Sequence, residues 1–98
     1  MADVPTTCKA AALTAAGQPL EIIDVKVPET LEHGAILVKT TMASICASDV
    51  HLWQGEAAVA ATQEFPRILG HEMTGRVVRL GGGVTHDSVG QPLGEGDR

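Results

Sequence analysis

The 98-residue sequence predicts a mostly β fold: a small, partly open antiparallel β-barrel, truncated, with one short helix. Apolar, β-branched segments are separated by Gly- and Pro-containing turns, which is the pattern of short strands. No long helical period alternates with these segments, so a doubly wound sheet is not supported. Aromatic residues make up only 2% of the chain, so its core must use Val, Ile, Leu and Ala. This length suffices for one small domain.

The first half of the chain predicts three strands. Residues 8–15 form the first, and the turn-like residues 16–19 end it. Residues 20–27 form the second strand, and residues 35–45 form the third after a polar loop. In the second strand, apolar and charged side chains occupy opposite faces: Ile23, Val25 and Val27 against Asp24 and Lys26. Such alternation predicts a half-buried strand.

The second half predicts one short helix and one long strand. Residues 48–53 resemble one or two helical turns, which Gly55 stops. Residues 57–61 are alanine-rich and compatible with a further helical turn, and residues 68–80 predict a strand of thirteen residues, ended by the glycines at 81–83. The remainder is rich in turn residues.

Charge and composition exclude several classes of function. The formal net charge is −5 and the basic residues are scattered, so nucleic-acid binding is not expected. No apolar run approaches a membrane span. The apolar residues 10–13 follow Asp3 without a basic segment, so they predict a strand rather than a signal peptide. With no export signal, Cys8 and Cys46 are expected to be free thiols or a metal thiolate in the cytoplasm.

The first group of chemically capable residues is Cys46-Ala47-Ser48-Asp49-Val50-His51. On a helix, Cys46 and Asp49 lie three apart on one face, and Ser48 and His51 on a neighbouring face. A thiolate is a good zinc ligand, and a hydroxyl next to an imidazole can pass a proton outward. Each residue alone has an ordinary structural interpretation, such as a buried thiol, a helix cap or a surface histidine.

The second group lies in Gly70-His71-Glu72-Met73-Thr74-Gly75. Adjacent side chains on a strand point in opposite directions, so His71 and Glu72 reach one metal only across a backbone irregularity. Gly70 can provide that irregularity. We therefore expect His71 to contact the metal and Glu72 to lie behind or beside it. The alternative is an ordinary strand with a hydrogen-bonded histidine and a surface glutamate.

Together these segments resemble the medium-chain, zinc-dependent alcohol dehydrogenases. Gly70-His71-Glu72-x-x-Gly75, followed by Gly81 and Val84, is similar to that family's zinc signature, and Cys46-x-Ser48-Asp49-x-His51 is similar to its first ligand segment. Thr7-Cys8-Lys9-Ala10-Ala11 resembles its opening strand, and Gly94-x-Gly96-Asp97-Arg98 the turn after the signature. The resemblance implies a GroES-like barrel, of which residues 1–98 are the N-terminal part.

The resemblance also implies roles for individual residues. Cys46 and His71 are expected to bind zinc, Glu72 to lie beside the zinc and ligate it permanently or in passing, and Asp49 to hydrogen-bond the zinc-bound histidine. The remaining roles concern the substrate: Ser48 would touch its hydroxyl, His51 would connect Ser48 to solvent, and Trp53 would form a wall of its pocket. The implied reaction is oxidation of an alcohol to an aldehyde or ketone with NAD or NADP.

Several parts of a complete family member are not found in these residues. No candidate for the third protein ligand of the zinc is present, since His86 lies in a polar, turn-rich stretch. The loop that holds a structural zinc and the glycine-rich dinucleotide fingerprint are also absent. We therefore expect a fragment without the nucleotide-binding Rossmann domain, inactive by itself and marginally stable.

Two alternatives remain. One is a non-enzymatic, small chaperonin-like binding or assembly module, which zinc content would distinguish. The other is a zinc-free reductase of the same superfamily, although such proteins lack the ligands corresponding to Cys46 and His71. The expected substrate is a small alcohol or carbonyl compound, either a secondary alcohol or a polyol. The full-length enzyme is expected to form a homo-oligomer without membrane or nucleic-acid partners.

Overall fold

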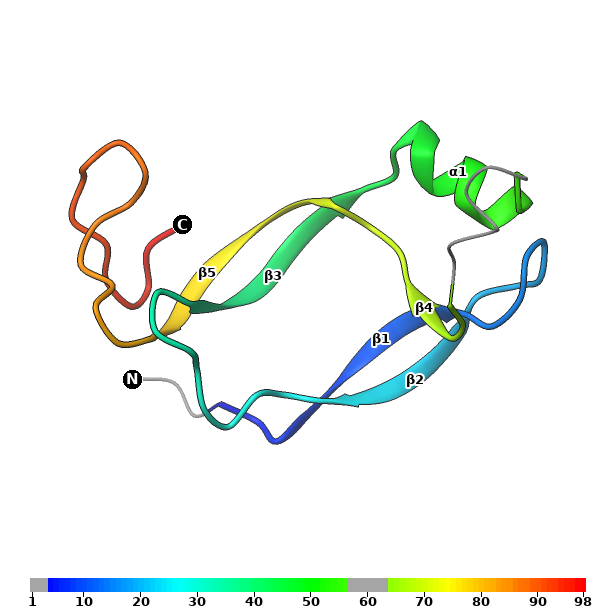
Figure 1. Cartoon of the computed structure of the whole chain (residues 1–98). Helices are drawn as coiled ribbons and strands as arrows, with labels where there is room; N and C mark the ends of the chain where they lie inside the picture. The colour runs from blue at the N-terminus through cyan, green and yellow to red at the C-terminus, as the bar shows by residue number, and fades with distance from the viewer. Residues whose placement is uncertain (1–3, 57–63) are drawn as a thin grey trace. The chain divides into compact units, whose positions relative to one another are not determined.

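The structure is a computed structural model that describes residues 4–56 and 64–98 (Figure 1). The elements follow the order β1 (Thr7–Leu13), β2 (Glu21–Lys26), β3 (Ile36–Ser44), α1 (Ala47–Gln54), β4 (Arg67–Ile68) and β5 (Glu72–Leu80). One sheet has the strand order β2-β1-β4, and a second consists of β3 and β5. Within the described residues the sheets do not close, which confirms the predicted mostly β, partly open fold with one short helix.

The chain divides into two compact units. The first, here called the helix unit, comprises Thr7–Val25 and Ala43–Glu72. The second, here called the ribbon unit, comprises Lys26–Met42 and Met73–Arg98 with the N-terminal residues. Each unit is described separately below.

In the helix unit, β1 is the central strand of its sheet. It pairs antiparallel with β4, with Ala12 opposite Ile68 and Leu13 opposite Arg67. Ala12 and Leu13 are completely buried. Because neighbouring strand residues point to opposite faces, both faces of β1 are covered at this end.

The alternation predicted for the second strand is confirmed in β2. Ile23 and Val25 are partly buried, whereas Asp24 and Lys26 are exposed. Asp24 forms an ion pair with Lys9 of β1 on the exposed side. The charged side chains therefore lie on the exposed face of β2, which also carries Ile22.

The prediction of one continuous strand over residues 68–80 is wrong, because the structure has two separate strands there. β4 ends at Ile68 and β5 begins at Glu72, so Leu69, Gly70 and His71 lie between two strands. Gly70 has a φ of +108°, a backbone conformation that residues other than glycine rarely adopt. The apolar pattern runs through this break, so hydrophobicity alone does not locate it. The helical turn predicted for residues 57–61 lies outside the described residues.

In the ribbon unit, β3 and β5 run side by side (Figure 1). The Gly81 N–H donates to the Ala35 carbonyl at 2.7 Å, and the Thr41 hydroxyl lies 3.4 Å from the Thr74 carbonyl. The partner number falls as the residue number rises, so the strands are antiparallel. Val77 of β5 is buried. α1, with eight residues, falls far short of a membrane-spanning length, and the described part of the chain contains no other helix.

Candidate metal centre

The first turn of α1 fixes the positions of Cys46 and Asp49. Cys46 precedes the helix with an extended backbone, and its N–H donates to Asp49 Oδ2 at 3.0 Å. In return, the Asp49 N–H donates to the Cys46 carbonyl at 3.0 Å. A carboxylate at the third helical position that accepts the N-cap N–H is half of a capping box. Local capping therefore holds the thiol and the carboxylate at the same end of α1.

The last turn of α1 rests on the turn between β1 and β2. Trp53 Nε1 donates to the Gln18 carbonyl at 2.8 Å, and the Gly17 N–H donates to the Trp53 carbonyl at 2.6 Å. Gly55 ends the helix with φ +73, and a Cβ there would lie 2.7 Å from the Ala16 Cβ. Only glycine fits this left-handed, closely packed position. The orientation of α1 within its unit is consequently fixed at both ends.

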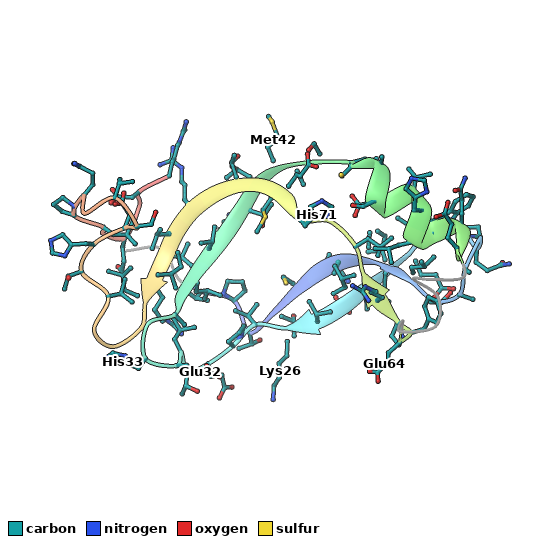
Figure 2. The ribbon with its side chains drawn as sticks, turned by 45° about the horizontal axis from the view of Figure 1, so that its top comes forward. Lys26, Glu32, His33, Met42, Glu64 and His71 are labelled. Carbon is teal, nitrogen blue, oxygen red and sulfur yellow. The ribbon has the colours of Figure 1, made fainter. Side chains whose placement is uncertain are left out.

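Cys46, His71 and Glu72 lie together beside the start of α1. One potential ligand atom from each residue lies within 4.8 Å of those of the other two. Figure 2 labels His71 just before β5. The positive φ of Gly70 interrupts the strand there, so His71 and Glu72 approach the same point although they are adjacent in sequence. A sulfur, an imidazole nitrogen and a carboxylate oxygen form a donor set that suits zinc.

The side chain of Glu72 has a lowered pKa, which favours its ionised form. Hydrogen bonds from the side chains of Cys46 and Ser44 hold the pKa of this carboxyl below its ordinary value of 4.5. The Ser44 hydroxyl donates to Glu72 Oε1 at 2.9 Å. Hydrogen bonds that favour the charged form lower a carboxyl pKa. Glu72 is therefore ionised at neutral pH and available to a cation.

Asp49 supplies an observation that tests whether these residues fit a metal. Its side chain is buried, yet Oδ1 has no hydrogen-bond partner among the described residues. His71 Nδ1 lies 3.4 Å from this oxygen, longer than a good N–H···O bond. An orphaned buried carboxylate oxygen is costly. A hydrogen bond from Nδ1–H would satisfy it and leave the Nε2 lone pair free for a metal, as in carboxylate–histidine–zinc arrangements.

Ser48 contacts this group from the helix. Its hydroxyl lies 3.4 Å from Cys46 Sγ and 3.4 Å from His71 Nε2. Ser48 is the second residue of α1 and not its N-cap, because Cys46 occupies the cap position. The hydroxyl is thus near the proposed ligands and free of a capping role.

His51 lies one turn further along α1. Its Nδ1 is 2.7 Å from Glu56 Oε1, beyond the end of the helix. Sequence reasoning missed Glu56 and also Ser44, the partner of Glu72. A glutamate directly after the helix-ending Gly55 is the signal that could have identified Glu56. We find no such signal for Ser44, whose contact with Glu72 spans 28 residues.

A cavity of about 400 Å³ opens next to the metal-ligand candidates in the helix unit. Asp49 and Ser44 contribute to its lining, so it adjoins the cluster. Trp53, the expected pocket wall, is part of it, and the rest is mainly apolar, with Leu20, Ile45, Val50 and Leu69. Its mainly apolar lining suits the hydrocarbon part of a small molecule.

Comparisons with known proteins identify the family of this chain. The model of the alcohol dehydrogenase GroES-like domain matches residues 32–95. The chain is 47% identical over 64 residues to 5-exo-hydroxycamphor dehydrogenase of Pseudomonas putida, covering 65% of this chain and 17% of that protein. It is 43% identical over 86 residues to alcohol dehydrogenase-like 4 of Arabidopsis thaliana, covering 86% and 21%.

A solved structure of an alcohol dehydrogenase is also similar to this chain. The crystal structure of an alcohol dehydrogenase from Thermotoga maritima is similar to this chain, with a TM-score of 0.75 and 36% sequence identity. The match covers 90% of this chain and 23% of the Thermotoga chain. The chain therefore spans about a fifth of the length of the relatives it matches. Because the family model matches well over half of the residues, the chain belongs to the alcohol dehydrogenase GroES-like domain family.

Proposed function

We propose that this chain forms the zinc-binding part of the catalytic domain of a zinc-dependent alcohol dehydrogenase. The intact enzyme would oxidise an alcohol to an aldehyde or ketone with NAD or NADP. The observation that carries the proposal is the convergence of Cys46, His71 and Glu72 next to the orphaned Asp49 carboxylate oxygen. A purely structural barrel does not require a buried acceptor aimed at an exposed histidine.

Each residue has a defined part in holding the metal. The Cys46 thiolate and His71 Nε2 are the principal ligands, and Glu72 offers an ionised carboxylate beside them. Asp49 Oδ1, which lies 3.4 Å from His71 Nδ1, would accept Nδ1–H in the metal-bound protein and so select the tautomer of His71 that can bind a metal. When bound, zinc supplies Lewis acidity to the oxygen of the alcohol or carbonyl substrate.

The substrate would lie in the adjoining cavity. Leu20, Val50 and Leu69 favour an apolar alcohol, so of the two classes expected from the sequence we propose a secondary alcohol rather than a polyol. Trp53 limits the width of the cavity. The Ser48 hydroxyl, which lies 3.4 Å from His71 Nε2, would contact the substrate hydroxyl, and the substrate proton would leave by way of Ser48 and His51 to water.

Other features of the intact protein follow from this proposal. Hydride transfer needs a nicotinamide cofactor, for which we propose a further, nucleotide-binding domain. Relatives of which the matched region covers only 17% and 21% are compatible with such a domain. We also propose a cytoplasmic homo-oligomer that acts on small molecules.

The proposal is tested by removing ligands from the intact protein. We expect Cys46→Ser and His71→Ala to abolish zinc retention, measured by inductively coupled plasma mass spectrometry, and to reduce NAD(P)-dependent alcohol oxidation to background. His86→Ala is the matched control, because His86 contacts Thr85 in the ribbon unit. Stoichiometric zinc or normal turnover in His71→Ala would refute the assignment. A zinc-free wild-type protein without dehydrogenase activity would favour a binding or assembly module.

A further inference from the structure

The end of α1 brings two ionisable side chains together through its backbone. The Gly55 N–H donates to the Leu52 carbonyl at 3.2 Å, and the Glu56 N–H donates to the His51 carbonyl at 3.4 Å. With Gly55 left-handed, this is a Schellman motif. The motif places the side chains of His51 and Glu56 next to each other, a position where two apolar residues usually make contact.

Here the apolar contact is replaced by a polar pair. His51 Nδ1 and Glu56 Oε1 are 2.7 Å apart, the length of a charge-assisted hydrogen bond. A carboxylate only accepts hydrogen bonds, so Nδ1 must carry the proton. In the neutral ring, Nε2 then holds the lone pair.

We propose that Glu56 is a positioning residue for proton transfer by His51. This inference rests on the proposed function, in which His51 receives the substrate proton by way of Ser48. Nε2 takes the proton, the ring becomes an imidazolium, and the Glu56 carboxylate balances its charge. The imidazolium then releases the Nε2 proton to water, which restores the neutral ring with Nδ1–H still held by Glu56.

The exposure of the pair sets the size of the effect. Both side chains are about half exposed, at 52% each, so water weakens their attraction. The main contribution of Glu56 is consequently the ring orientation and the tautomer. Because the motif uses only backbone groups of Glu56, substitution of its side chain should leave α1 intact.

The tautomer is measured directly by nitrogen-15 NMR of the intact protein labelled at histidine, with His51→Asn identifying the resonances. We expect neutral His51 to be protonated mainly at Nδ1 in the wild type. In Glu56→Ala the population should shift towards Nε2–H. In Glu56→Gln the amide oxygen can still accept from Nδ1–H, so this variant should retain the wild-type tautomer. Identical tautomer populations in Glu56→Ala and the wild type would overturn the proposal.

Kinetics then test the consequence for catalysis. Glu56→Ala should lower kcat roughly two- to fivefold, as expected for loss of a half-exposed pair, with unchanged KM and zinc content. Glu56→Gln should recover most of the loss. Full activity in Glu56→Ala despite a shifted tautomer would overturn the positioning role. An inactive wild-type protein would refute the proposed function, while the NMR result would still decide the His51–Glu56 pairing.

Discussion

The helix unit and the ribbon unit use the same residue types in different ways. In the ribbon unit, aspartates satisfy their own turns: Asp97 accepts the Gly94 N–H at 2.7 Å, and Asp87 Oδ1 accepts two N–H groups within four residues. In the helix unit, Asp49 caps α1 with one oxygen and directs the other towards His71, which lies in a different segment. Local satisfaction stabilises turns, whereas an unsatisfied group directed across segments is typical of a functional site.

The histidines and arginines show the same contrast. His86 contacts the hydroxyl of the preceding Thr85, and Arg76 and Arg79 donate to backbone carbonyls in the ribbon unit. His71, by comparison, lies near side chains of both α1 and β5. Residue type therefore does not identify the site, and the convergence of segments does.

The largest difference in turnover between substitutions in the two units is expected for Ser48 in the helix unit. Ser48→Ala should reduce turnover of the intact protein roughly 100-fold, because a group that transfers a proton is lost. Zinc content should remain unchanged, since Ser48 is not assigned as a ligand. Ser88→Ala, in a ribbon-unit turn, is the control and should retain wild-type turnover. Loss of zinc from Ser48→Ala would mean that the roles of Ser48 and the ligands have been misassigned.

The next effect is on zinc affinity, compared between variants of Asp49 and Asp97. Asp49→Asn retains an oxygen for the Cys46 N–H but loses the charged acceptor for His71 Nδ1–H. We expect zinc affinity to fall about 10- to 100-fold, measured by competition with a chelator. Asp97→Asn should leave the affinity unchanged. Equal zinc affinities of the two variants would remove the distinction between the units.

The last effect concerns the free energy of unfolding, not zinc or turnover, and is expected at two left-handed glycines. Gly55→Ala and Gly90→Ala should each cost about 1 kcal/mol for the positive φ. Gly55→Ala should cost roughly 1–3 kcal/mol more, because its Cβ meets Ala16, whereas that of Gly90 meets nothing within 4 Å. Urea unfolding monitored by circular dichroism measures both. Equal destabilisation would show that α1 does not pack closely against the β1–β2 turn.

The candidate site was partly predictable from the sequence. The three-residue spacing of Cys46 and Asp49 predicts their common helix face, and capping at the start of α1 places them together. The position of Gly70 indicated an irregularity next to His71 and Glu72, and its φ of +108 supplies one. The prediction of one long strand over 68–80 was wrong, because the hydrophobic pattern of the side chains does not reveal a single residue with positive φ.

Other parts of the site depend on contacts that no local pattern encodes. Ser44 and Glu72 are 28 residues apart, and Ser48 and His71 are 23 apart. Glu56 lies close to His51 in sequence, yet the two side chains meet only because Gly55 turns the chain.

By itself, the sequence determined the mostly β class, the short helix and the residue types able to hold a metal, because periodicity, turn residues and donor chemistry are local properties. The tertiary structure decided which of the four histidines lies close to both a cysteine sulfur and a glutamate carboxylate, and which buried aspartate oxygen lacks a hydrogen-bond partner within residues 4–56 and 64–98. Those outcomes depend on contacts between segments that are far apart in the sequence, such as Ser44 with Glu72 and Ser48 with His71, and no single segment encodes such long-range contacts.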